Sequence, residues 1–111
     1  MEIRENENVF ILTPLSRKLD KKESQRILKN LLTESRESAL DLSYVQDCTI
    51  EFIEDLIKIA KTKTLGIFNI SSDIFVLFNL MNIDKNIKLF VNQKDFEENS
   101  RQLINRQFRV V

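Results

Sequence analysis

Hydrophobic residues along this chain alternate between short runs typical of β-strands and longer stretches with the spacing of amphipathic helices. Residues 2–5 and 9–13 flank a polar turn at residues 6–8, which predicts an antiparallel hairpin ended by Pro14. Three later segments have the composition of buried strands: residues 39–45, 65–70 and 87–91. Strands and helices are therefore expected to alternate after the hairpin.

The segment after the hairpin is predicted to form a helix that begins with a capping box. The Asp20 carboxylate can accept a hydrogen bond from the amide of Glu23, and the Glu23 side chain can reach back to the amide of Asp20. The apolar residues that follow share one face at helical spacing: Ile27, Leu28, Leu31 and Leu32. We therefore expect an amphipathic helix that packs on the sheet.

Three further helices are predicted. One follows the third strand, and the apolar residues of its inward face are Phe52, Ile53, Leu56, Ile57 and Ala60. Another spans residues 73–81 behind a cap at Ser71 or Ser72. It holds more apolar residues than one core-facing stripe needs, so we expect part of it to be core and part to be an exposed partner surface. The last spans residues 94–104, and residues 106–111 fit a helix end, an extra strand or a loose end.

A hairpin followed by three strand–helix units predicts an α/β fold with a mixed sheet of about five strands and about four helices. The crossovers between parallel strands are expected to be right-handed. At 111 residues the chain is long enough for one core, so residues 1–111 are predicted to form a single domain. In such sheets, ligands and partners meet the edge beyond the carboxyl ends of the strands.

Composition argues for a soluble protein without enzymatic activity. The 17 Lys and Arg residues balance the 17 Asp and Glu residues, which gives no basis for binding nucleic acid, and no apolar run is long enough to cross a membrane. Histidine is absent and Gly66 is the single glycine, which argues against a histidine base, a histidine-bound metal and a glycine-rich phosphate loop. The lone Cys48 and the polar N-terminus indicate a reducing, cytoplasmic setting.

The most informative stretch is residues 39–50, where an apolar strand passes through a polar turn into an amphipathic helix. Thr49 lies at the predicted helix start, where unpaired amides and the positive end of the helix dipole stabilise a negative group. Thr49 is therefore either an ordinary helix cap or a site of modification. Cys48 is either a small buried filler or a redox-sensing thiol. Asp20 and Asp47 are interpreted as cap and turn residues rather than catalytic acids.

Several short sequences occur in an order that is typical of one known family. They are Leu19-Asp20 after an early strand, the strand Leu40-Asp41-Leu42-Ser43, the turn Asp47-Cys48-Thr49, the junction Phe68-Asn69-Ile70-Ser71 and the helix end Leu80-Met81-Asn82-Ile83-Asp84. In order and spacing they resemble the STAS domains, the family of the bacterial anti-sigma factor antagonists, over residues 9–96. The resemblance implies a STAS-like mixed sheet that opens with an antiparallel hairpin and continues with parallel strands.

In that family, the second hydroxyl residue of an Asp-Ser-Ser-Gly turn is phosphorylated by a partner kinase that is also an anti-sigma factor. Carried over to this chain, the phosphorylated residue is Thr49, preceded by Asp47 and Cys48, and Ile50 replaces the glycine. The resemblance implies a partner-binding surface formed by Asp20, Asp47, Cys48, Thr49 and Ile50. A phosphate there adds about −1.5 to −2 charges, which an apolar or acidic partner surface would reject.

Three functions are compatible with these observations. The first is a cytoplasmic bacterial protein of a partner-switching system that regulates transcription. It binds an anti-sigma factor with serine/threonine kinase activity and is switched by phosphorylation of Thr49. The second is a STAS-like subunit that binds one partner constitutively, as in lipid-transport or stress-sensing complexes, and Ile50 favours it. The third is a thiol-dependent sensor or enzyme that acts through Cys48. Neither of the first two functions requires a cofactor or a metal.

Overall fold

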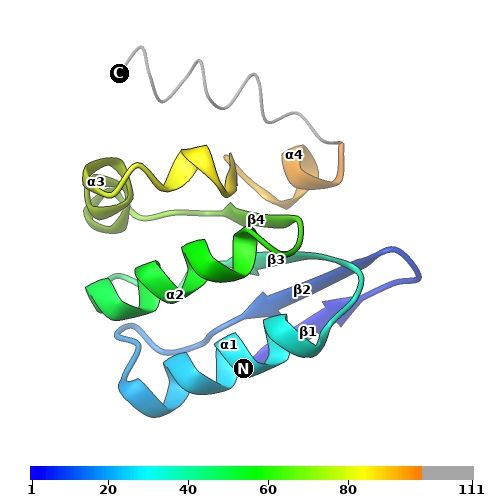
Figure 1. The fold of residues 1–111 in the computed structure, drawn as a ribbon, viewed down its shortest axis with the longest axis horizontal. Helices are drawn as coiled ribbons and strands as arrows, with labels where there is room; N and C mark the ends of the chain where they lie inside the picture. The colour runs from blue at the N-terminus through cyan, green and yellow to red at the C-terminus, as the bar shows by residue number, and fades with distance from the viewer. Residues whose placement is uncertain (99–111) are drawn as a thin grey trace.

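Residues 1–98, the part of the chain that the structure describes, form a five-stranded mixed sheet covered by helices (Figure 1). The structure is a computed structural model. The strands lie side by side in chain order: β1 (Glu2–Glu5), β2 (Val9–Thr13), β3 (Glu37–Asp41), β4 (Leu65–Phe68) and β5 (Lys88–Phe90). β1 pairs antiparallel with β2, and the remaining neighbours pair in parallel, as the sequence predicts.

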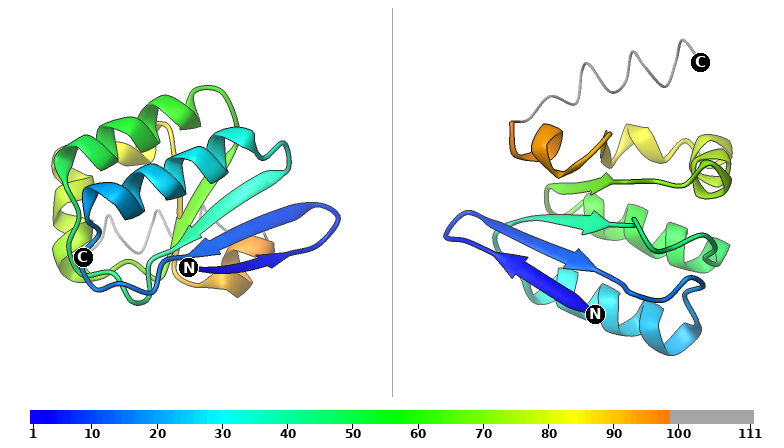
Figure 2. Two further views of the ribbon diagram at one scale, coloured as in Figure 1. Left: turned by 90° about the horizontal axis from the view of Figure 1, so that it is seen from below. Right: turned by 180° about the vertical axis from the view of Figure 1, so that it is seen from behind.

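The helices occupy both faces of this sheet. They are α1 (Lys21–Thr33), α2 (Ile50–Ala60), α3 (Ser72–Leu80) and α4 (Gln93–Glu97), and the 3₁₀ helix η1 (Ile83–Lys85) lies between α3 and β5. α1 and α2 lie next to each other on one face, and α4 lies on the opposite face (Figure 2). No helix within residues 1–98 has the length and apolar composition that crossing a bilayer requires.

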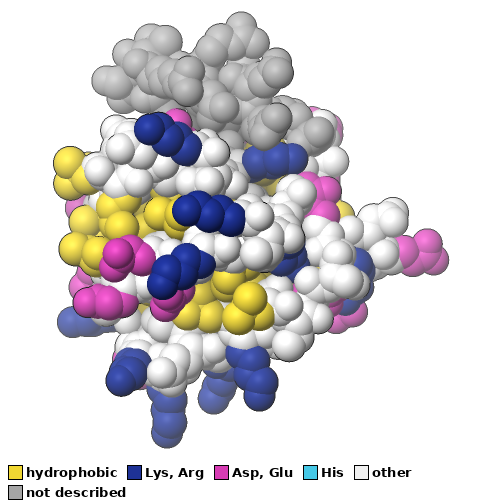
Figure 3. Space-filling view, in the orientation of Figure 1, with side chains coloured by type: hydrophobic (Ala, Val, Ile, Leu, Met, Phe, Trp, Pro, Cys, Tyr) yellow, Lys and Arg dark blue, Asp and Glu magenta, His cyan; other side chains and the backbone are white. Residues whose placement is uncertain are grey.

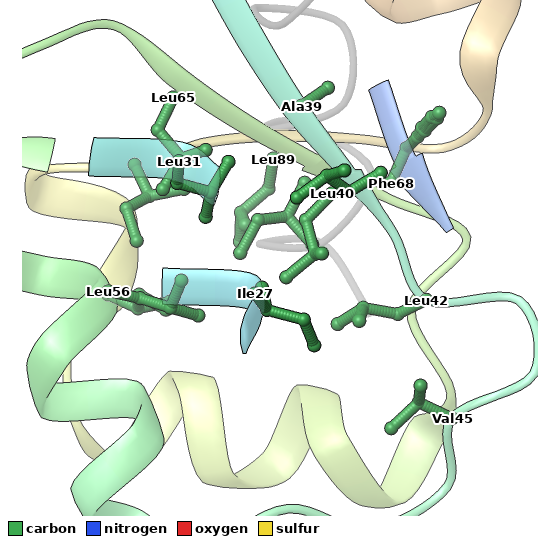
Figure 4. Packing of buried hydrophobic residues seen from close by; sticks show 14 of the residues in the cluster. Ile27, Leu31, Ala39, Leu40, Leu42, Val45, Leu56, Leu65, Phe68 and Leu89 are labelled. Atoms are coloured by element: carbon green, nitrogen blue, oxygen red, sulfur yellow. The ribbon is translucent and has the colours of Figure 1, made fainter. Parts of the chain in front are cut away.

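One row of aliphatic side chains crosses the sheet beneath α1 and α2. Its members are neighbours in the strand register and are almost completely buried: Leu12, Leu40, Ile67 and Leu89. Ile27 and Leu31 of α1 and Leu56 of α2 cover this row (Figure 4). Because successive strand residues point to opposite faces, the same strands present a different set of side chains to α4.

Gly66 allows α4 to approach the second face closely. A Cβ atom at Gly66 would lie 3.0 Å from the ring of Phe96, the buried side chain of α4. The Phe96 ring also meets Phe90 edge to face at 5.4 Å and Phe68 at 5.8 Å between ring centroids. The single glycine of the chain therefore serves packing, because an aromatic ring occupies the space beside it.

The hairpin is confirmed to the residue, whereas the other three strands are shorter than predicted. The predicted strand at residues 39–45 begins at Glu37 and ends at Asp41. It ends because the Asp41 carboxylate accepts a hydrogen bond from the Ser43 amide and redirects the chain. The segment 65–70 ends at Phe68 because Asn69 adopts a left-handed conformation with φ of 56°.

The helix predictions are confirmed in position, but Leu32, which was predicted on the inward face of α1, is 62% exposed. Asp20 caps α1 by accepting from the Glu23 amide at 2.8 Å, but the Glu23 carboxylate accepts from the Ser16 hydroxyl, so the reciprocal half of the capping box is wrong. In α2 Ile59 is buried, whereas Ile57 and Ala60 are half-buried. Of the helix predicted at residues 94–104, the described residues contain only the first part, which is α4. Its remainder and residues 106–111 lie outside the described residues.

Lys63 joins the two covering helices at the amino-terminal end of the sheet. It lies in the loop after α2, and its Nζ donates to the backbone oxygens of Leu31 and Glu34, at the end of α1, and to Ser38 Oγ at 2.7 Å. Burial lowers the pKa of the Lys63 ammonium. These bonds satisfy carbonyl groups that a helix end otherwise leaves without partners.

We predict that Lys63→Met lowers the free energy of unfolding by about 1–3 kcal/mol, because a charged donor is lost from three acceptors. Urea unfolding followed by circular dichroism measures this change. The matched control is Lys61→Met, an exposed lysine at the end of α2 that should change stability by a few tenths of a kcal/mol. Equal effects of the two substitutions on stability would show that the hydrogen bonds of Lys63 do not stabilise the fold.

Candidate functional site

Three helices begin at the same edge of the sheet, beyond the carboxyl ends of the parallel strands. Each has a side-chain cap that accepts a hydrogen bond from the amide three residues further on: Asp20 from Glu23 at 2.8 Å, Thr49 from Phe52 at 3.1 Å and Ser71 from Ile74 at 3.3 Å. We call this edge the rim. In Figure 1 the starts of α1, α2 and α3 lie together at the left of the molecule.

Thr49 is exposed on the rim and precedes the first residue of α2. Its backbone is extended, with φ of −85° and ψ of 156°, which is the geometry of a helix N-cap. The unpaired amides and the dipole of α2 create positive potential beside its hydroxyl. Ile50 is the first residue of α2 and is 55% exposed, and its φ is not positive. The backbone at this position therefore does not require the glycine that the STAS family has there.

Two rim loops are joined by backbone hydrogen bonds. The amide of Leu19 donates to the oxygen of Asp47 at 3.1 Å, and the amide of Gln46 donates to the oxygen of Arg17 at 2.7 Å. The Arg17 Nε also donates to the Gln46 side chain at 2.7 Å. These contacts form an isolated parallel bridge between Lys18 and Asp47. The loop that leads to the Asp20 cap therefore lies against the loop that leads to Thr49.

The carboxylate of Asp41 holds the base of the rim. Asp41 is 5% exposed, and one of its oxygens accepts from the Ser43 amide at 3.0 Å and from Asn69 Nδ2 at 3.1 Å. Its other oxygen accepts from Arg4 Nη2 at 2.8 Å and from Thr13 Oγ1 at 3.3 Å. One buried charge thus connects β1 and β2 with the turns that follow β3 and β4.

Sequence reasoning missed the role of Asp41, which it treated as part of a strand. The available signal was a carboxylate within an apolar strand, because such a charge needs paired donors when it is buried. The principal donor, Arg4, also donates to the side chain of Gln93 at the start of α4. The hydrogen bonds around Asp41 and Arg4 therefore extend from the rim to the second face of the sheet.

Cys48 has a buried side chain, in contrast to the other residues predicted to form the partner surface. Asp20, Asp47, Thr49 and Ile50 are exposed, whereas Cys48 is 8% exposed and packs in the core. Burial, assisted by the negative charge of Asp47, raises the pKa of the Cys48 thiol from 9.0 to about 11. The geometry favours the buried-filler interpretation over the redox-sensing one.

We predict that Cys48 reacts slowly with iodoacetamide in the native protein. A rise in pKa from 9.0 to about 11 lowers the thiolate fraction at pH 7.5 by about a hundredfold relative to the unfolded chain. Mass spectrometry of the labelled protein, with and without urea, gives the two rates. The native rate should increase with pH up to about pH 11, and a native rate equal to the rate in urea would contradict the assignment.

Exposed apolar side chains accompany the polar groups of the rim. Tyr44 lies in the turn after β3, Ile50 starts α2, and Val76 and Leu80 lie on α3, and each is more than half exposed. Figure 3 shows acidic side chains over the start of α2 and hydrophobic side chains over α3. The prediction that part of α3 is exposed is thus confirmed. Exposed apolar side chains that lie close together are typical of protein interaction sites.

The carboxylate of Asp20 and the backbone of Asp47 have structural partners on the rim. Within residues 1–98, no three His, Cys, Asp or Glu side chains cluster in a way that could hold a metal ion. Asp20 serves as a helix cap, and the Asp47 backbone is bound to the neighbouring loop. The arrangement presents the exposed residue Thr49 among apolar and charged side chains.

The sheet order, the antiparallel first pair and the positions of the helices define the STAS-domain fold. A crystal structure of a candidate anti-sigma factor antagonist from Thermotoga maritima is 17% identical in sequence, and the match covers 90% of this chain and 93% of that chain with a TM-score of 0.77. An anti-sigma factor antagonist from Mycobacterium paratuberculosis is 15% identical, with 85% and 86% covered and a TM-score of 0.72.

A third similar structure is an anti-sigma factor antagonist (STAS) domain protein from Planctomyces limnophilus. It is 17% identical, the match covers 85% of this chain and 91% of that chain, and the TM-score is 0.69. No family model and no curated protein matches the sequence. The three similarities establish the fold, which agrees with the resemblance seen in the sequence.

Proposed function

We propose that this protein is a partner-binding module of the anti-sigma factor antagonist type in the bacterial cytoplasm. Residues 1–111 act as one STAS-like domain without catalytic activity. The docking surface is the rim, with Asp20, Asp47, Thr49 and Ile50 as its exposed members. The anti-sigma factor antagonists among the similar structures support this assignment at the level of the fold.

The observation that carries the proposal is the exposed hydroxyl of Thr49 at the start of α2. A partner that docks on the rim must cover this hydroxyl, and it meets Ile50 next to it. A phosphate at the same atom would place about −1.5 to −2 charges in the interface. The modified and unmodified proteins would therefore prefer different partners.

The proposed switch is a phosphoryl transfer from ATP by the kinase partner. A bond forms between Thr49 Oγ and the γ-phosphorus as the bond to the ADP leaving oxygen breaks. The hydroxyl proton passes to a base on the kinase. The Thr49 oxygen already accepts from the Phe52 amide, so the hydroxyl is held in one place for the reaction.

A constitutive partner is the second candidate, and the exposed Ile50 favours it. The β-branched Ile50, 55% exposed beside Thr49, lies where a kinase would have to approach, and its bulk hinders modification of the hydroxyl. In this alternative the domain is a fixed subunit of a lipid-transport or stress-sensing complex, and Thr49 acts as a helix cap.

The test is incubation of the full chain with Mg-ATP and the anti-sigma-type kinase encoded nearest to its gene, followed by intact mass measurement. We expect one added phosphate, its loss in Thr49→Ala and its retention in Thr64→Ala, since Thr64 is also exposed but lies away from the rim. An unmodified mass and no complex with the kinase would contradict the proposal.

The variant Thr49→Glu separates the two candidates in a measurement of binding affinity. A switched antagonist should lose affinity for its anti-sigma partner by about tenfold or more, because a carboxylate then enters the interface. A constitutive subunit that docks through another surface should retain its partner. Isothermal titration calorimetry with Thr64→Glu as the matched control measures both outcomes.

A further inference from the structure

A groove of about 350 Å³ runs between α1 and α2 and includes Thr49 in its lining. Leu28 and Phe52 provide its apolar walls, and Lys21 and Ser24 face it from the first turns of α1. Both helices begin at this end of the groove, so their positive dipole ends lie side by side. The groove is thus adjacent to the hydroxyl that the proposed function would modify.

Ser24 is the unexplained polar group of this groove. The residue is 6% exposed, and its hydroxyl oxygen is buried without a hydrogen-bond partner in the described part of the chain. An unpaired buried hydroxyl costs free energy, and native proteins rarely leave one without a purpose. Its position on the wall shared with Lys21 and Thr49 points to an acceptor that arrives at this site.

The charges around the groove are mixed. Lys21 is an exposed cation in the first turn of α1, whereas Glu51 and Asp55 line the groove from α2. Asp55 has Lys58 at 3.9 Å, and the Asp20 carboxylate is occupied by the Glu23 amide. On the loop before Thr49, the charged neighbours of Asp47 around a shallow depression are Arg17, Lys18 and Asp73. Lys21 is therefore the cation that the groove itself offers to an anion at Thr49.

We propose that this groove receives the phosphate of phosphorylated Thr49, with the Lys21 ammonium and the Ser24 hydroxyl donating to its oxygens. The inference rests on the proposed modification of Thr49. The phosphate would connect the first turn of α1 with the start of α2, so the modified protein differs from the unmodified one in shape at the rim as well as in charge. The free amides of α2 add donors to the same phosphate.

A phosphate attached to the chain needs little affinity to occupy the groove. The attachment at Thr49 makes the contact intramolecular, and its effective concentration is high. A free anion lacks this advantage, and the carboxylates of Glu51 and Asp55 repel both the free and the attached phosphate. The groove is accordingly assigned to the phosphate on Thr49 and not to inorganic phosphate from solution.

The test uses full-length protein with phosphothreonine installed at position 49 by suppression of an amber codon, so neither kinase nor partner is involved. ³¹P NMR follows the second ionisation of the phosphate, which is near pH 6 in free peptides. A nearby cation favours the dianion, so Lys21→Gln should raise the titration midpoint by about half a pH unit. The matched control Lys22→Gln, in the same first turn but outside the groove lining, should shift it by much less.

Ser24→Ala provides the second arm. In the unmodified protein it should leave the melting temperature unchanged or raise it, because it removes an unpaired hydroxyl. In the phosphorylated protein it should raise the midpoint of the ³¹P titration. Equal midpoints for Lys21→Gln and Lys22→Gln, or no shift with Ser24→Ala, would overturn the inference. Failure of a kinase to modify the natural chain would count against the proposed function alone.

Discussion

The structure depends on one buried carboxylate, that of Asp41. A charge in an apolar sheet is tolerated when donors surround it, and Asp41 receives four of them from separate elements. Arg4 supplies the compensating charge from β1. The two turns that leave β3 and β4 are fixed by the Ser43 amide and the Asn69 side chain. The same carboxylate that keeps the core electrically balanced therefore sets the shape of the rim.

The rim follows from this constraint together with the geometry of parallel strands. Parallel β2, β3 and β4 all end at one edge, so the helices that follow them also start there. Each start needs a capping side chain, which places three oxygen-bearing residues on one surface. Thr49 differs from Asp20 and Ser71 because an exposed apolar residue, Ile50, follows it directly. A cap thereby becomes part of a surface suited to binding another protein.

Local chemistry explains which features the sequence predicted correctly. The hairpin, the Asp20 cap and the Thr49 cap depend on residues that are close in the chain, and their hydrogen bonds span few positions. The pairing of the buried Asp41 carboxylate could not be read in this way, because its charged partner, Arg4, precedes it by 37 positions. The groove beside Thr49 was also missed, since Ser24 and Phe52 come together only when α1 packs against α2.

Amide hydrogen exchange in Asp41→Ala tests the central claim most directly, because each amide reports its own surroundings. The Ser43 amide donates to Asp41, and the Phe52 amide donates to the Thr49 cap. Leu31, buried in α1, serves as the internal reference for the loss of global stability. We predict that Ser43 and Phe52 both exchange faster relative to Leu31, by about tenfold or more. Phe52 protection that follows Leu31 unchanged would show that Asp41 does not hold the rim.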